Sequence, residues 1–134
     1  MIGLDTNVLA RFLVADDEVQ AARARSYIEH AVAEGEMLYI NRVVLAETVW
    51  ILTKFYRQSR SALAGAIERV LLTVEFEVEE KQLAWEALHE FRRGGADFAD
   101  TLIGTVNRSA GCSTTVTFDK QAGKLKTFSL LGTM

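Results

Sequence analysis

Hydrophobic and polar positions follow one another along the chain in blocks that predict short strands separated by helices. Apolar or alternating runs typical of strands occupy residues 1–4, 37–40, 74–78, 113–118 and 127–131. Apolar residues recur at helical spacing in residues 6–13, 17–34, 42–56, 59–73, 79–93 and 97–109. This alternation predicts an α/β sandwich with a mostly parallel sheet, in which ligands usually bind at the carboxyl ends of the strands.

The ends of these helices carry their own signals. Gly35 closes the second helix, Asn41 is a good N-cap for the third, and the last two helices end at Gly94 and Gly111. The chain has no proline, no linker rich in glycine and serine, and no internal repeat. We therefore expect its 134 residues, 1–134, to form a single domain.

Charge and composition exclude several classes of protein. The net charge is −3, whereas a protein that binds nucleic acid by charge alone is usually basic, so phosphate binding would need a local basic patch or a bridging cation. Cys112 is the single cysteine, which excludes an internal disulfide and a cysteine-based zinc site, and two histidines are too few for a His-rich metal site. No apolar run approaches the ~18 residues of a membrane span. The amino terminus lacks the pattern of a signal peptide, so we expect a soluble protein in a reducing cytoplasm.

Three acidic residues stand out by their context. Asp5 follows the run "MIGL" and Asp119 follows "TTVTF", so each lies at the carboxyl end of a predicted strand, where it serves either a ligand or a helix N-cap. Glu47 lies in "VVLAETVWIL", where its neighbours are nearly all apolar, and we expect it to be at least partly buried. A buried carboxylate needs a partner, which is either a base such as Arg42 or a bound cation.

Two further acids lie in "GGADFADTLIG", residues 94–104. On a helical wheel Asp97 lies nearly opposite the apolar stripe of the following helix, as a solvated N-cap does. Asp100 lies nearer the edge of that stripe, where it suits either the acidic position of a capping box or a place in a cleft.

Carboxylates that converge on one point repel each other strongly unless a cation lies between them. Oxygen ligands without His or Cys indicate a hard ion, Mg²⁺ or Mn²⁺. Such an ion can activate a water molecule and neutralise a phosphodiester oxygen, so hydrolysis of a phosphodiester is the chemistry that these acids favour.

Four segments carry a resemblance to a known family: "GLDTNVLARFL" (3–13), "NRVVLAETVWIL" (41–52), "GADFADTLIG" (95–104) and "TVTFDK" (115–120). Together they resemble PIN-domain ribonucleases, specifically the VapC-type toxins of prokaryotic toxin–antitoxin modules, over essentially the whole chain. The resemblance implies a PIN-like three-layer α/β/α sandwich with a short, mostly parallel central sheet. It also implies metal-dependent endonucleolytic cleavage of RNA, a homodimer, and inhibition by a cognate VapB-type antitoxin.

The resemblance also assigns site residues. Its acidic quartet, which would bind Mg²⁺ or Mn²⁺, corresponds to Asp5, Glu47, Asp100 and Asp119. Asp97 is implied as a companion acid, either beside the ligands or binding a second ion. Supporting polar positions correspond to Thr6, Asn7 and Thr117.

Other interpretations compete with a toxin. One is a non-toxin enzyme of the same fold, such as a nuclease in RNA processing or a structure-specific DNA nuclease. Another is a catalytically silent scaffold that only pairs with an antitoxin. A third is a receiver-like module that accepts a phosphoryl group, but "MLYIN" ends without the aspartate that a receiver needs.

Two surface features also have alternative interpretations. Basic residues near the motifs either contact RNA phosphates or form an ordinary charged surface, and Arg92 and Arg93 are the best candidates for RNA contact. The apolar segment "VWILTKFY" (49–56) is either a helix covered on all sides, or a dimer interface or antitoxin groove.

Overall fold

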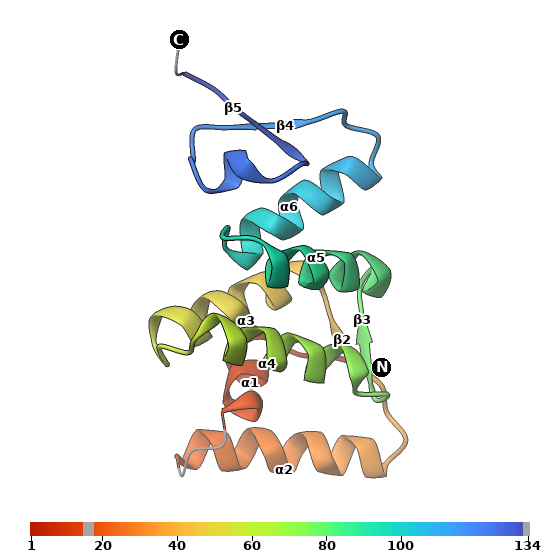
Figure 1. Cartoon of the computed structure of the whole chain (residues 1–134). Helices are drawn as coiled ribbons and strands as arrows, with labels where there is room; N and C mark the ends of the chain where they lie inside the picture. Colours follow the sequence, from red (N-terminus) through yellow and green to blue (C-terminus); the bar gives the residue numbers. More distant parts are fainter. Residues whose placement is uncertain (15–17, 133–134) are drawn as a thin grey trace. The chain divides into compact units, whose positions relative to one another are not determined.

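A computed structural model describes residues 1–14 and 18–132 of the chain (Figure 1). It divides into two compact units, Met1–Lys81 and Gln82–Met134, and each is described by itself. The predicted start of the second helix at residue 17 lies outside the described residues.

The first unit contains a parallel sheet of three strands in the order β1-β2-β3. Its strands are β1 (Ile2–Gly3), β2 (Leu38–Ile40) and β3 (Phe76–Val78), with Leu38 opposite both Ile2 and Phe76. Parallel neighbours need crossover connections, and helices provide them here: α1 (Thr6–Leu13), α2 (Val19–Ala33), α3 (Arg42–Lys54) and α4 (Arg60–Leu72). The predicted α/β fold with short parallel strands is confirmed.

The core of the first unit comes from the apolar positions that set the helical and strand spacing. Fully buried side chains come from the helices α1, α3 and α4 and from the strands β2 and β3: Leu9, Leu38, Ile40, Leu45, Leu52, Ile67 and Phe76. Burial of each such side chain contributes about 1.5–3 kcal/mol relative to exposure. The burial holds α1 against α2 and α3, and α3 against α4.

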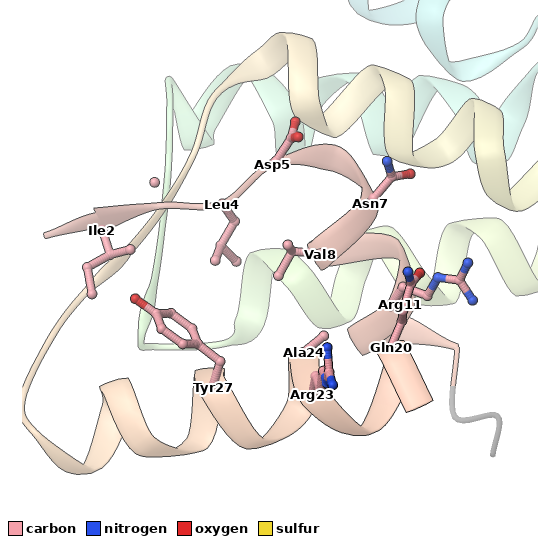
Figure 2. A pocket seen from close by; sticks show the side chains of 11 residues that line it. Ile2, Leu4, Asp5, Asn7, Val8, Arg11, Gln20, Arg23, Ala24 and Tyr27 are labelled. Carbon is pink, nitrogen blue, oxygen red and sulfur yellow. The ribbon is translucent and has the colours of Figure 1, made fainter. Parts of the chain in front are cut away.

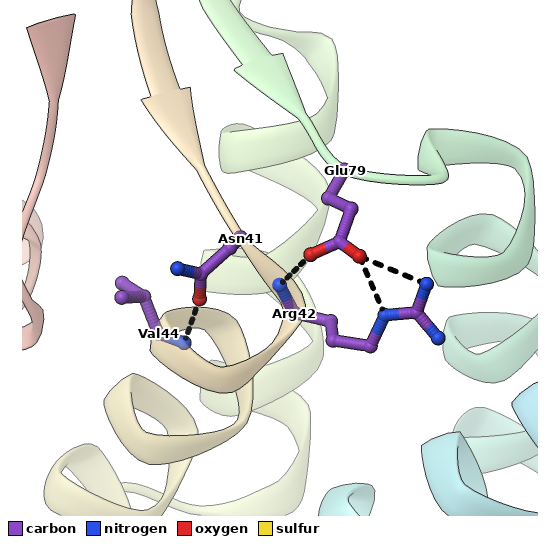
Figure 3. Close-up of polar contacts among 4 residues, drawn as sticks. All are labelled: Asn41, Arg42, Val44 and Glu79. Carbon is purple, nitrogen blue, oxygen red and sulfur yellow. Dashed lines mark hydrogen bonds and ion pairs between the residues drawn. The ribbon is translucent and has the colours of Figure 1, made fainter.

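The amino end of α3 is fixed by two polar interactions (Figure 3). The Asn41 side chain caps the helix by accepting a hydrogen bond of 2.8 Å from the Val44 amide, as predicted. Glu79, directly after β3, accepts hydrogen bonds from the backbone amide of Arg42 at 3.0 Å and from its Nε at 2.9 Å, and the Arg42 Nη2 lies 2.9 Å away. The start of α3 is therefore attached to the carboxyl end of β3.

The second unit consists of helices and a two-stranded parallel sheet. Its elements are α5 (Lys81–Arg93, which begins at the boundary), α6 (Phe98–Ser109), β4 (Thr115–Thr117), the 3₁₀ helix η1 (Ala122–Lys124) and β5 (Phe128–Leu130). β4 pairs with β5, with Thr115 opposite Phe128. Gly104 on α6 is a close-approach position, because a Cβ there would collide with the side chain of Thr127.

Every predicted helix and strand is present, with differences at the ends. The helix predicted from residue 79 begins at Lys81, since Glu79 is paired with Arg42 and Glu80 has φ +48°, outside the helical region. The helix η1 was not predicted, because three residues are too few to carry a periodicity. Among the residues that the structure describes, no helix combines the length and apolar character needed to cross a bilayer.

Replacing Arg42 by Met tests the attachment of α3 to β3. The interaction is bidentate and charge-assisted, so we expect Arg42→Met to lower the free energy of unfolding by about 1–2 kcal/mol at neutral pH. Hydrogen bonds from Arg42 hold the pKa of Glu79 below its ordinary value, despite a contrary effect of burial. This contribution is therefore fully present above the unfolded-state pKa of Glu79 and is lost as pH falls through the lower folded-state value.

Urea denaturation followed by circular dichroism, at neutral and at acid pH, measures this contribution. Lys54→Met, on the exposed side of the same helix, is the matched control and should change little. A destabilisation of Arg42→Met that stays the same at acid pH would show that the Glu79 charge is not involved.

Candidate active site

Asp5 occupies the junction between β1 and α1. The apolar run of β1 ends at Leu4, and Asp5 then serves as the N-cap of α1, with extended backbone angles (φ −83°, ψ 162°). Its Oδ1 accepts a hydrogen bond of 2.8 Å from the Thr6 amide. The side chain is exposed at the carboxyl end of a parallel strand, where the sequence placed it.

Thr6 connects the first acid to the second. Its backbone amide binds Asp5, and its buried side-chain hydroxyl donates a hydrogen bond of 2.8 Å to Oε1 of Glu47, which lies 41 residues further along the chain. The structure therefore brings Asp5 and Glu47 to either side of one threonine. A hydroxyl buried in this way also fixes which direction the Glu47 carboxylate faces.

Glu47 departs from prediction in two respects. Its side chain is exposed rather than partly buried, because α3 turns Val44, Leu45, Thr48, Val49 and Leu52 toward the core and leaves Glu47 on the other side. Arg42 was also considered as the partner of Glu47, but it is paired with Glu79 instead. The partner of Glu47 is the Thr6 hydroxyl.

Asp97 and Asp100 have different positions in the second unit. Asp97 is exposed and is the N-cap of α6, where its Oδ1 accepts a hydrogen bond of 2.8 Å from the Asp100 amide. Asp100 is half-buried in the first turn of the helix. The distinction drawn from the helical wheel, a solvated cap and an acid at the edge of the core, is confirmed for the positions of these residues.

The electrostatics of Asp100 set it apart from the other acids. Partial burial raises the pKa of the Asp100 carboxyl above its ordinary value, and the negative charges of Asp97 and Asp119 raise it further. A hydrogen bond with the Asp97 side chain acts on the pKa in the same direction. The negative charges of Asp97 and Asp119 therefore act on Asp100, and a cation beside these carboxylates would relieve the repulsion.

Asp119 follows β4 and is held by the backbone around it. Its Oδ1 accepts hydrogen bonds from the amides of Gln121 at 2.8 Å and Ala122 at 2.9 Å, which places the carboxylate at the start of η1. The Asp119 amide in turn donates to Oγ1 of Thr117 at 3.0 Å. Thr117 therefore accepts a hydrogen bond from the backbone at Asp119, and its supporting role in the site stays a prediction.

The candidate residues thus form two groups. Asp5, Thr6, Asn7 and Glu47 lie in the first unit, and Asp97, Asp100, Thr117 and Asp119 lie in the second. Across the described residues, no three side chains of His, Cys, Asp or Glu form a cluster that could hold a metal ion. All the acids nevertheless offer oxygen, the donor that Mg²⁺ and Mn²⁺ prefer, so their chemistry fits either ion.

The other predicted site residues are on the surface. Asn7 is exposed on the first turn of α1. Arg92 and Arg93 are exposed in the last turn of α5, and Arg93 lies 3.6 Å from Glu90 on the same helix, so part of its charge is neutralised locally.

Comparison with known sequences decides the family. The sequence model of the PIN domain matches residues 2–127, a range that includes every candidate acid. This chain belongs to the PIN domain family. The predicted family is thereby confirmed.

A curated relative of this PIN domain comes from Aquifex aeolicus (strain VF5) and is called "VapC ribonuclease". The two are 28% identical over 122 residues, which cover 91% of this chain and 90% of the relative. The likeness is therefore to a whole protein rather than to a part of one.

Substitution of Asp97 separates its charge from its role as a cap. Asp97→Asn keeps a good N-cap and removes the charge, so the pKa of Asp100 should fall toward its ordinary value. Asp97→Ala should lower that pKa as well, and should also destabilise the protein by about 1 kcal/mol through loss of the cap. Carboxyl-carbon NMR titration and urea denaturation measure the two effects. An unchanged pKa of Asp100 in both variants would contradict the electrostatic coupling.

Proposed function

We propose that this PIN domain is a VapC-type toxin, a metal-dependent endoribonuclease that hydrolyses RNA phosphodiester bonds with Mg²⁺ or Mn²⁺. The observation that carries the proposal is its likeness to the VapC ribonuclease over nearly the full length of both chains. Membership of the PIN family counts against the receiver-like alternative. We also propose that both units belong to one domain, since the family match extends across their boundary.

In the proposed mechanism, Asp5, Asp100 and Asp119 would hold the ion, and Glu47 would be a further ligand or would orient the attacking water. The ion would activate that water and stabilise negative charge on the scissile phosphate. The hydrogen bond from Thr6 fixes the orientation of Glu47, and the Gln121 and Ala122 amides fix that of Asp119. The raised pKa of Asp100 supports the proposal, because carboxylates that repel one another gain most from a cation. The proposed mechanism assigns no role to a histidine.

The proposed partners follow from the same likeness. We propose that a VapB-type antitoxin inhibits the enzyme and that the enzyme is a homodimer in the cytoplasm. Exposed apolar side chains at and beside α3 support a partner surface there, since Trp50 is 54% exposed and Phe55 is 71% exposed. Their rings contact each other edge to face, with centroids 6.0 Å apart.

Loss of the ion or of its ligands should abolish cleavage. We expect Asp5→Ala, Asp100→Ala, and EDTA treatment of the wild type each to reduce RNA cleavage by at least about a hundredfold. Asp97→Asn is the matched control and should retain more activity than Asp100→Asn, because Asp97 is primarily a cap. Gel assays of a labelled RNA pool with Mg²⁺ measure this, and the products should carry 5′-phosphate and 3′-hydroxyl ends. Cyclic-phosphate ends, or full activity in EDTA, would contradict the mechanism.

The hydroxyl of Thr6 should matter for activity more than for stability. Thr6→Val removes the donor to Glu47 but keeps the shape of a buried side chain, so cleavage should fall about 10–100-fold. Thr6→Ser restores the hydroxyl and should recover most of the rate. If Thr6→Ser is as slow as Thr6→Val, or if Thr6→Val loses its circular dichroism signal, Thr6 acts through packing and not through Glu47.

A further inference from the structure

A hollow of about 640 Å³ lies beside Asp5 in the first unit, lined by residues of β1, α1 and α2. We call it the α1–α2 hollow. Figure 2 shows that Leu4 and Val8 turn toward α2, where Ala24 and Tyr27 face them, so the floor is apolar. The carboxylate of Asp5 lies at the end of β1, on the opposite side of the chain from Leu4 (Figure 2).

The hollow also has charged residues in its lining. Among the described residues these are two arginines, Arg11 and Arg23, and one aspartate, Asp5. Glu18 pairs with Arg11 and offsets its charge. Arg23 is exposed and has no ion pair with any of the described residues, so its charge is available to an anion.

Tyr27 gives the hollow an aromatic wall. It follows Arg23 by four residues, one turn of α2, so the two side chains lie on the same side of the helix. Tyr27 lines the hollow and is 51% exposed as a residue, although a tyrosine gains from burying its ring. Gln20 and Asn7, which also line the hollow, offer amide donors and acceptors at its edge.

An apolar floor, an aromatic ring, amide groups, and an arginine with no ion pair among the described residues are features that can together bind an unpaired nucleotide. Proteins recognise single-stranded RNA by stacking bases on aromatic rings, by hydrogen bonds to the base edges, and by cations at the phosphates. A hollow of this volume is in the range of small-ligand sites. An apolar side chain of a protein partner would make no favourable electrostatic interaction with the charge of Arg23.

We propose that the α1–α2 hollow binds one nucleotide of the RNA substrate next to the scissile phosphate, with its base against Tyr27 and its phosphate at Arg23. The proposal rests on the proposed ribonuclease function. It makes Arg23 and Tyr27 substrate-binding residues outside the acidic quartet, and gives an acidic protein a local site for a polyanion. Neither residue was singled out from the sequence. Their spacing of four residues on one predicted helix indicates only that their side chains lie on the same side of that helix.

Binding and cleavage of RNA test this separately. The probe is a short, fluorescein-labelled single-stranded RNA of mixed sequence, and binding is measured by anisotropy in EDTA, with a gel to confirm that the RNA stays intact. Tyr27→Ala should weaken binding at least about fivefold through loss of stacking, whereas Tyr27→Phe should bind like the wild type. Arg23→Gln should reduce the slope of log affinity against log salt by about 0.7, the change expected for one phosphate contact on a single strand.

Arg25→Gln is the matched control for Arg23→Gln, because Arg25 is on the same helix but lines a different hollow, next to Phe12 and Arg69. With Mg²⁺, the two test variants should raise KM and leave kcat nearly unchanged. If the wild type cleaves RNA but Arg23→Gln and Tyr27→Ala bind it like Arg25→Gln, the nucleotide site is wrong and the ribonuclease function stands. If the wild type neither binds nor cleaves RNA, the proposed function fails and this proposal fails with it.

Discussion

Four of the five candidate acids share one kind of interaction: a hydrogen bond that fixes one carboxylate oxygen in place. Asp5 is held by the Thr6 amide, Asp97 by the Asp100 amide, and Asp119 by the amides of Gln121 and Ala122. Glu47 is the exception in its donor, since a side-chain hydroxyl replaces the backbone amide. These bonds satisfy amides that the start of a helix leaves without partners, so local folding and the placement of the acids have the same cause.

An acid held in this way is both a structural and a chemical group. A carboxylate has two oxygens, and in Asp5, Asp97 and Asp119 the capping bonds are made to Oδ1. Capping therefore does not compete with metal binding through the second oxygen. The same hydrogen bonds reduce the rotational freedom of the side chain, which lowers the entropy cost of ordering it around a cation.

The sequence predicted the elements well because the signals for them are local. The run "MIGL" ends at Asp5 and the helix after Asn41 is capped as expected, and both signals lie within a few residues of what they predict. The exposure of Glu47 was mispredicted because α3 is apolar on more than one side, and sequence alone does not tell which side is covered. Val43, four residues before Glu47, is 62% exposed. The contacts of Arg42 with Glu79 and of Thr6 with Glu47 join residues 37 and 41 positions apart in the sequence. They depend on how the strands and helices pack, so no periodic pattern in the sequence predicts them.

The segment "GADFAD" shows how burial separates two acids that look alike in sequence. Asp97 is exposed, and its cap on α6 accounts for it without any ligand. Asp100 is half-buried, close enough to Asp97 and Asp119 for both to raise its pKa, and none of these neighbours offers it a positive charge. Both desolvation and like charge oppose ionisation of the Asp100 carboxyl, and both raise its pKa. A divalent cation would offset both effects at once, which agrees with the proposed role of Asp100 as a ligand and with that of Asp97 as a cap.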